Sequence, residues 1–556
     1  MTNYSAKIFN NAVSALSAQQ AIIAATANNI ANVNTEGYAR RVVGLETRYG
    51  SGSSTGSIQI GNGVAVTDIT RMADQFLEGL TREAISTSTY YQTEKDFMAR
   101  IQPIFSLTED VNSIGPAMTK FFSSLEDLSV NPSSMELRSE VLERAQDVVT
   151  SIRSAYGTVS ALQAEAEERL TAEIESVNSL TASIAELNGF ISVQEATGQV
   201  AADERDQRTK LLEQLSERIS YQMSERADGS VTLTLNNGFP LVNGMESRAL
   251  ELTAAPSFST GTYPPKLDGT NMKFIVFDYD ASSSSSAHLN LTDEFAGGQG
   301  AVGALLAMRG SASISDTNPF QATGTLPELA GRIEAIARDL MTRFNETYRG
   351  PEATANPTAN FDPSAVDLNG NNPGLFGFFN AGAITISDSD ADGIPDNADL
   401  NAAVAAGSLI SFAAELTLAI TAPEEIAAGR DAVNGSTISG GNAQNLIASD
   451  GLLALKTATA TFSSDSSNTF QRSNVTYDQL YNETVGRAGH LHARAATNAQ
   501  VSADNKLSAE TKRDQISGVS LDEEFTNLVK FQKAFEANAR VLRSAQDILD
   551  TIIGLV

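Results

Sequence analysis

Both terminal segments of this 556-residue chain carry a seven-residue apolar repeat, although more than 450 residues separate them. Such a row, with a second row three or four residues away, is the a/d spacing of helices that supercoil around a partner. The N-terminal row consists of Phe9, Leu16, Ile23 and Ile30, with Val13, Gln20 and Ala27 as the second row. The C-terminal row consists of Leu521, Leu528, Phe535, Leu542, Leu549 and Val556, with Phe525, Ala539 and Ile553 in the second row and Gln532 and Gln546 interrupting it.

The charge of the chain lies almost entirely between these two segments. Residues 1–45 carry a net charge of +2 and residues 515–556 a net charge of −2, whereas the whole chain carries −29. Near-neutral ends can pack against copies of themselves without strong repulsion, while an acidic middle keeps an assembly soluble. The pattern favours a polymer subunit, with an assembly interface at Phe9, Leu16, Ile23, Ile30, Leu521, Phe525, Leu528, Phe535, Leu542 and Leu549. The same spacing also fits ordinary amphipathic helices of a globular core.

An asparagine-rich segment follows the first helix. Asn28, Asn29, Asn32 and Asn34 lie within seven residues, and Gly37 follows them before a β-like stretch from Arg40 to Leu45. Asparagine and glycine adopt the left-handed conformation that ends helices, so the segment predicts a helix exit. A simple helix stop accounts for the glycine but not for four asparagines.

This segment, ANNIANVNTEGYAR, resembles the N-terminal signature of the flagellar rod, hook and hook-associated protein family. The C-terminal motifs GVSLDEE, NLVKFQ and FEANAR, and the interior motifs GALLAMR and GGNAQN, resemble the branch of that family that joins hook to filament. The resemblance is close over residues 1–45 and 515–556, fair over roughly 70–345 and 435–514, and absent over about 350–430. Hook protein and distal rod protein share the asparagine-rich signature and are the alternatives within the family.

The resemblance implies a structural subunit of the bacterial flagellum at the hook–filament junction, which assembles through paired N- and C-terminal helices. It implies contacts with copies of itself, with hook protein and with the second junction protein, and an export chaperone that covers the C-terminal helix. It also implies secretion without a cleaved signal peptide and a location outside the cell. The uncharged but Asn-, Gln- and Ser-rich start of the chain likewise disfavours a secretory signal peptide.

Between the ends, helical patterning predicts a long helix over 141–191 and further helices over 72–101, 203–219, 327–348 and 477–507. Thr197 and Gly198 break the pattern, and Asp203 can cap the following helix. Strand patterning predicts strands at 219–223, 231–235 and 273–278, with turns at Asp228-Gly229 and Asn236-Asn237-Gly238.

These patterns predict an α+β multidomain fold. Terminal coiled-coil helices form one domain (1–45 and 515–556), and an elongated helical bundle forms a second (46–219 and 435–514). A β-rich domain with a following helix occupies 220–349, and a variable insertion occupies 350–434. With 41% hydrophobic and 19% charged residues, the composition is ordinary for a globular protein.

The insertion contains a motif with the spacing of a twelve-residue calcium loop. Carboxylates stand at positions 1, 3, 5, 9 and 12, glycine stands at position 6, and position 7 supplies a backbone carbonyl in such loops. The candidate ligands are Asp388, Asp390, Asp392, Ile394, Asp396 and Asp399. The twelfth residue is shorter than the usual bidentate Glu and clear flanking helices are lacking, so the motif predicts weak Ca²⁺ binding. A solvated acidic turn is the other interpretation, and an extracellular calcium-binding surface or adhesin protein is a further alternative function.

The chain contains few of the residues and motifs that enzymes and nucleic-acid-binding proteins require. It contains no cysteine and only three histidines, which excludes thiolate catalysis and Cys-based zinc sites and disfavours a catalytic triad. The sequence has no Gly-rich phosphate loop, and its negative charge disfavours nucleic-acid binding. No stretch is long and apolar enough to insert into a membrane. The chain is therefore not expected to be an enzyme.

Overall fold

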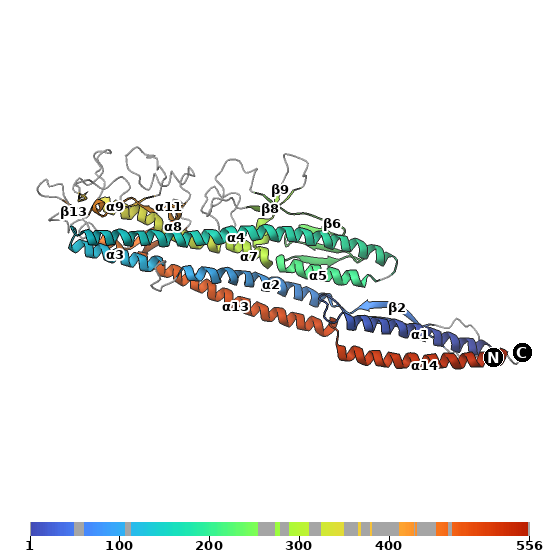
Figure 1. Cartoon of the computed structure of the whole chain (residues 1–556). Helices are drawn as coiled ribbons and strands as arrows, with labels where there is room; N and C mark the ends of the chain where they lie inside the picture. The colour runs from blue at the N-terminus through green and yellow to red at the C-terminus, as the bar shows by residue number, and fades with distance from the viewer. Residues whose placement is uncertain are drawn as a thin grey trace. The chain divides into compact units, whose positions relative to one another are not determined.

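The computed structural model describes two units of the chain, each containing segments that are distant in sequence (Figure 1). Unit 1 consists of residues 1–89, 175–249 and 500–556, and unit 2 of residues 90–174 and 250–499. The four-domain division made from the sequence remains a prediction. The described residues are 2–48, 61–105, 113–198, 200–253, 273–278, 288–310, 324–349, 365–368, 378–380, 411–427, 429–430, 452–464 and 470–553.

Long helices dominate both units, with several small separate antiparallel sheets, which confirms the predicted α+β multidomain class. The helices of more than ten residues are α1 (Thr2–Ala31), α2 (Gln75–Ile101), α3 (Ile114–Val130), α4 (Met135–Ala196), α5 (Ala202–Arg218), α8 (Thr325–Asp339), α13 (Tyr477–Ser517) and α14 (Leu521–Ile553). Each predicted helix is present, and α4 extends the predicted 141–191 helix at both ends. Among the described helices, none combines the length and apolarity that crossing a membrane requires.

In unit 1 the terminal helices α1 and α14 lie side by side and run in opposite directions (Figure 1). Strands β1 (Arg41–Thr47) and β2 (Val64–Arg71) follow α1 and pair as an antiparallel hairpin, with an irregularity between Val43 and Leu45. Both strands also contact α1. The helix pair is therefore joined directly to the segment that leaves α1.

A four-stranded antiparallel sheet completes unit 1, in the order β3 (Gln222–Glu225), β4 (Val231–Thr234), β5 (Pro240–Asn243) and β6 (Glu246–Ser247). Its first strand begins at Gln222, slightly later than predicted, because Ile219 is buried at the end of α5. Both predicted turns are present, with φ of 78° at Gly229 and 85° at Gly238. These left-handed values explain the glycines, since side chains rarely adopt them.

Unit 2 contains a three-stranded sheet and a cluster of buried aromatic rings. The sheet has the order β7 (Glu251–Thr253), β8 (Phe274–Asp278) and β9 (His288–Asn290), and the short helix α6 (Thr292–Ala296) follows it. The predicted 327–348 helix is α8, a π-helical turn (Leu340–Phe344) and α9 (Asn345–Arg349). The rings of Phe121, Phe344 and Phe378 have centroids 5.6–5.7 Å apart.

The interior motif GALLAMR forms helix α7 (Gly300–Arg309), which is almost entirely buried. A Cβ atom at Gly303 would lie 2.4 Å from the carbonyl oxygen of Gly298, so only glycine allows this approach. The Arg309 guanidinium is buried, pairs with Glu167 and donates to the Lys273 carbonyl oxygen at 3.0 Å. The motif is therefore part of the core of unit 2.

The described parts of the 350–434 insertion are anchored to helices of unit 2. They include the short helix α11 (Phe412–Glu415). They also include the two-residue strands β10 (Ala365–Val366), β11 (Phe379–Asn380), β12 (Thr417–Leu418) and β13 (Gly429–Arg430). Buried Glu334 accepts hydrogen bonds from the backbone N–H groups of Phe412 (2.9 Å) and Ala413 (3.2 Å). Burial raises the pKa of Glu334 to about 7, although these donors oppose the shift. The Arg138 guanidinium donates to the Ile426 carbonyl oxygen at 2.5 Å. The described parts of the insertion thus pack into the core of unit 2.

The described part of unit 2 also includes β14 (Ala460–Ser463) and β15 (Gln471–Val475), which pair antiparallel and lead into α13. The motif GGNAQN at 440–445 lies outside the described residues.

Candidate assembly site

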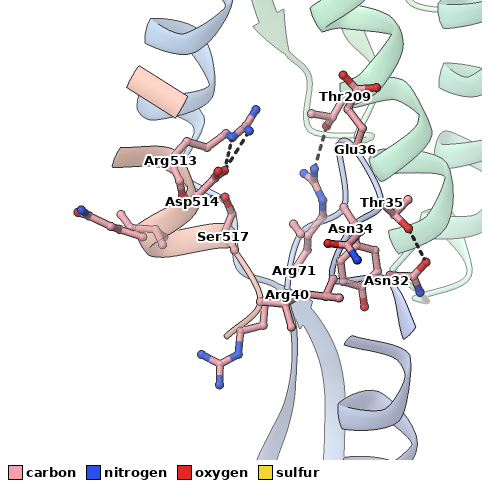
Figure 2. Close-up of a pocket in the computed structure, with 18 of the residues that line it drawn as sticks. Asn32, Asn34, Thr35, Glu36, Arg40, Arg71, Thr209, Arg513, Asp514 and Ser517 are labelled. Carbon is pink, nitrogen blue, oxygen red and sulfur yellow. Dashed lines mark hydrogen bonds and ion pairs between the residues drawn. The ribbon is translucent and has the colours of Figure 1, made fainter. Parts of the chain in front are cut away.

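A polar pocket of about 670 Å³ lies in unit 1 where the exit of α1 meets the link between α13 and α14 (Figure 2). Its wall contains the asparagine-rich segment from Asn32 to Arg40, the link from Arg513 to Ser520, and residues of α5 such as Thr209. The pocket therefore gathers segments from the beginning, middle and end of the sequence.

Beside the pocket, the buried side chain of Asn29, which is 2% exposed, joins the end of α1 to β1 and α14. Its Nδ2 donates to the Arg41 carbonyl oxygen (3.0 Å) and to Glu524 Oε2 (3.2 Å). Its Oδ1 accepts from the Arg41 N–H (2.9 Å) and from the Tyr38 hydroxyl (2.7 Å). A buried amide with both ends satisfied strongly favours a single arrangement. Asn29 thus fixes the end of α1, the start of β1 and the start of α14 to one another.

The neighbouring polar residues shape the exposed turn after α1. Asn32 Nδ2 donates to Asn28 Oδ1 (2.8 Å), and the Thr35 hydroxyl donates to Asn32 Oδ1 (3.1 Å), as Figure 2 shows for the second pair. Gly37 ends the turn with φ of 79°, and a Cβ atom there would lie 3.1 Å from Lys210 Cβ. Burial raises the pKa of Tyr38 to about 12, so its hydroxyl remains a donor. The predicted helix exit is confirmed, and Asn28, Asn29 and Asn32 have identified hydrogen bonds.

Arg40 connects this exit to the beginning of α14. Its Nε lies 2.7 Å from Glu524 Oε1 and its Nη1 lies 3.1 Å from Glu523 Oε2. Its backbone N–H donates to the Ser517 carbonyl oxygen at 2.9 Å, which satisfies the last turn of α13. At Gly518, a Cβ atom would lie 2.3 Å from the Asp514 carbonyl oxygen, so the link requires glycine.

A second group of ion pairs connects the hairpin to α5. Arg41 pairs with Asp203 and, at 3.2 Å, with Asp206. Arg71 Nε lies 2.5 Å from Asp206 Oδ1, and its Nη2 donates to the Thr209 hydroxyl at 2.8 Å (Figure 2). Although burial opposes it, hydrogen bonding to the two aspartates raises the pKa of Arg41. Asp203 was predicted to cap α5, but the cap position is Ala201, and the Asp203 carboxylate serves Arg41 instead.

The end of α13 is also held on α5. Arg513 Nη1 lies 2.6 Å from Glu213 Oε1. Burial raises the pKa of Glu213, and the charge of Arg513 opposes that shift. The charged side chains around the pocket are thus engaged in pairs that hold segments in place. Their arrangement positions α1 and α14 so that the two helices can pack together.

The residues of the predicted assembly interface lie on α1 and α14, but they are not equally covered. Within the chain, Leu521 and Phe525 are exposed and the side chain of Leu549 is outside the described set. Contact with a second copy remains a prediction for all of them. The half-buried members are Phe9, Leu16, Ile23, Ile30, Leu528, Phe535 and Leu542.

The covered face of α14 differs from the predicted seam in its second row. Glu524 and Ala545 are buried, and Phe531 and Asn538 between them are half-buried, at seven-residue intervals. This row lies beside the Leu528 row, whereas the predicted second row begins with Phe525, which is 51% exposed. Sequence reasoning missed the covered row because polar Glu524 and Asn538 do not fit an apolar repeat.

The calcium-loop motif, residues 388–399, lies outside the described residues. Among the residues that the structure does describe, no group of three or more His, Asp or Glu side chains could hold a metal ion.

Three family descriptions match separate parts of the chain. Residues 98–361 match "Flagellar hook-associated protein FlgK helical domain". Residues 9–38 match "Flagella basal body rod protein", and residues 513–555 match "Flagellar basal body rod FlgEFG protein C-terminal". The last two matches contain Asn29 and Glu524, respectively, the two side chains that join α1 to α14.

Similarity to individual proteins extends over nearly the whole chain. "Flagellar hook-associated protein 1" of Bacillus subtilis (strain 168) is 26% identical over 550 residues, which cover 97% of this chain and 96% of that protein. The protein of the same name from Escherichia coli (strain K12) is 25% identical over 592 residues, 99% of each chain. The solved structure of the flagellar hook junction protein FlgK from Burkholderia pseudomallei has a TM-score of 0.55 at 15% identity, over 79% of this chain and all of that one. At 15% identity, the similarity to this solved structure shows a shared fold alone.

Proposed function

Because this chain belongs to the family of flagellar hook-associated protein 1, we propose that it is the structural subunit that joins hook to filament in the bacterial flagellum. Copies of the chain assemble in the flagellar axis through the paired helices α1 and α14. Hook protein and distal rod protein, the alternatives within the family, are less well supported, because residues 98–361 match a hook-associated helical domain.

The observation that carries this proposal is the joining of α1 to α14 through Asn29 and Glu524, which leaves apolar side chains of α14 uncovered. Phe525 and Val529 are 51% and 57% exposed. Covering such side chains with a neighbouring copy contributes roughly 25 cal/mol per Å² of apolar area. Contacts repeated around an axis therefore add up to a strong junction.

The partners follow from this position in the flagellum. We expect contacts with hook protein on one side and with the second hook–filament junction protein on the other. Before assembly, an export chaperone covers the C-terminal helix, whose exposed apolar residues would otherwise associate prematurely. Export uses the flagellum-specific channel without a cleaved signal peptide, and the assembled protein is extracellular.

Deletion of the gene in the source bacterium tests the function directly. We expect cells with hooks of normal length but without attached filaments, because filament subunits then have no junction on which to assemble. Electron microscopy of the isolated hooks and a motility assay measure this outcome, and expression of the intact chain in the same strain is the control. Filaments that remain attached to hooks in the deletion strain would contradict the proposal.

For the acidic loop at 388–399 we propose weak Ca²⁺ binding, since five carboxylates at calcium-loop spacing repel one another without a cation. Calorimetric titration of the full chain should give a Kd of roughly 10⁻⁴ to 10⁻³ M, as in extracellular calcium modules. The variant with Asp388→Asn and Asp392→Asn should lose this heat. Equal heats from both proteins would contradict the assignment.

A further inference from the structure

The side of α14 that faces away from its covered row carries an ordered pattern of charges. At about 100° per residue, the covered row from Glu524 to Ala545 marks the α1 side of the helix. Most of the exposed charged residues of α14 lie on the other side. In a single chain these side chains face solvent, so the pattern bears on contacts between chains.

Apart from exposed Glu536, which pairs with Lys533 at 3.2 Å, the N-terminal half of α14 presents acids first and then bases. Asp522 and Glu523 stand in the first turn, and Lys530 and Lys533 follow them. All four side chains are exposed. Glu523 pairs with Arg40 but remains 62% exposed, so it can accept a second basic partner.

The C-terminal half of α14 presents the same blocks with reversed signs. Arg540 and Arg543 come first, and Asp547 and Asp550 follow, all exposed. Glu523 precedes Arg543 by 20 positions, and Lys530 precedes Asp550 by the same number. A parallel copy displaced by this distance would place the opposite charges of these two pairs side by side. An undisplaced parallel copy would place like charges together, which is unfavourable.

Two of the three exposed apolar residues in the N-terminal half of α14 show the same displacement, whereas Phe525 stands 20 positions before buried Ala545. Leu521 precedes Val541 by 20 positions, and Val529 precedes Ile548 by 19. These four side chains are between 41% and 57% exposed. At 1.5 Å per residue, a displacement of 20 residues corresponds to about 30 Å along the helix axis.

The positions around the helix also agree with this displacement. We compare mean angular positions around the helix axis, counted at about 100° per residue in the direction of the chain. In the N-terminal half the mean position of the charged residues lies about 110° after that of the exposed apolar residues. In the C-terminal half the charged residues lie about 130° before the apolar ones. The angular order is mirrored when two parallel helices face each other. Because the two halves of α14 have opposite angular orders, packing one half on the other brings apolar side chains against apolar side chains and charged residues against charged residues.

We propose that neighbouring copies pack their α14 helices in parallel with an axial displacement of about 30 Å, so that the N-terminal half of one α14 lies on the C-terminal half of the next. This inference rests on the proposed function and defines its intersubunit contact. The contact is heterologous, since two different surfaces of the same helix meet, and it can therefore repeat along an axis.

Cysteine cross-linking in assembled flagella tests the displacement, because the natural chain has no cysteine. With Leu521→Cys and Val541→Cys in one chain, oxidation of isolated hooks should give a ladder of disulfide-linked multimers on a non-reducing gel. The matched control combines Leu521→Cys with Ile548→Cys, which lies one helical repeat further on, and should remain monomeric. Incorporation without a ladder, or equal ladders from both variants, would overturn the proposed displacement.

Charge reversal gives an independent measurement. Lys530→Glu with Lys533→Glu should lower the amount of chain in isolated hooks at least tenfold, and adding Asp547→Lys with Asp550→Lys should restore it. Reversing all four charges of the C-terminal half in the otherwise natural chain is the control, and should itself lower assembly. Normal assembly of that control, or no rescue by the matched variant, would contradict the register. Immunoblots for the unaltered chain in hooks isolated from the parent strain test the proposed function separately. Absence of the chain from those hooks would refute the function rather than the register.

Discussion

Replacing Asn29 with alanine is expected to release the start of α14 from the end of α1. The change removes four hydrogen bonds and leaves the buried Glu524 carboxylate with fewer donors. Unsatisfied buried polar groups cost about 1–3 kcal/mol each, so we expect a local loss of ~2–4 kcal/mol. Hydrogen exchange in residues 521–534 should accelerate by roughly 30- to 700-fold, at 1.4 kcal/mol per factor of ten.

The adjacent Asn28 supplies a matched control, since its side chain is exposed and bonds only within the turn. Its replacement by alanine should change the exchange of α14 by less than about threefold, corresponding to ~0.5 kcal/mol for a surface substitution. Similar acceleration in the two variants, or none in the Asn29 variant, would show that Asn29 does not hold α14.

Introducing a carboxylate into the C-terminal heptad row should abolish assembly while the rest of the protein stays folded. Leu528→Asp and Leu542→Asp each place a charge on a half-buried position of the α1–α14 pair. The loss of apolar burial and the burial of a polar group together cost roughly 2–4 kcal/mol per subunit. We expect at least a tenfold loss of the chain from isolated hooks and non-motile cells.

The control for this prediction is Leu507→Asp on α13, the same chemical change at a side chain that is 63% exposed. That variant should enter hooks normally. Circular dichroism of the three purified proteins should show nearly equal helix content, because the other helices do not depend on the terminal pair. Normal motility with Leu528→Asp or Leu542→Asp would contradict the role of the row.

Local patterns in the sequence predicted the elements of this fold well. The apolar stripe of α4 that includes Val148, Leu170 and Ile184 is buried, whereas Phe190, which lies off this stripe, is exposed. A stripe at helical spacing determines which side of a helix faces a core. Gly37, Gly229 and Gly238 mark the expected helix stop and turns, where positive φ requires glycine. These features depend only on residues near one another in the chain.

The assembly site was only partly predictable, because its main contacts join distant residues. Asn29 and Glu524 are 495 positions apart, and no local pattern indicates that the amide of one donates to the carboxylate of the other. The asparagine-rich segment signalled an unexplained feature, and the structure supplies the bonds. The same limit applies to buried Glu334, whose partners at residues 411–413 lie in a segment without a predicted fold.

Electron cryomicroscopy of the isolated hook–filament junction tests the central claim most directly, by locating the terminal helices of each subunit. We predict that α1 and α14 of every subunit remain paired and pack against the same helices of neighbouring copies around the axis. Terminal helices that stand free of their neighbours, with subunits joined only through unit 2, would contradict this account.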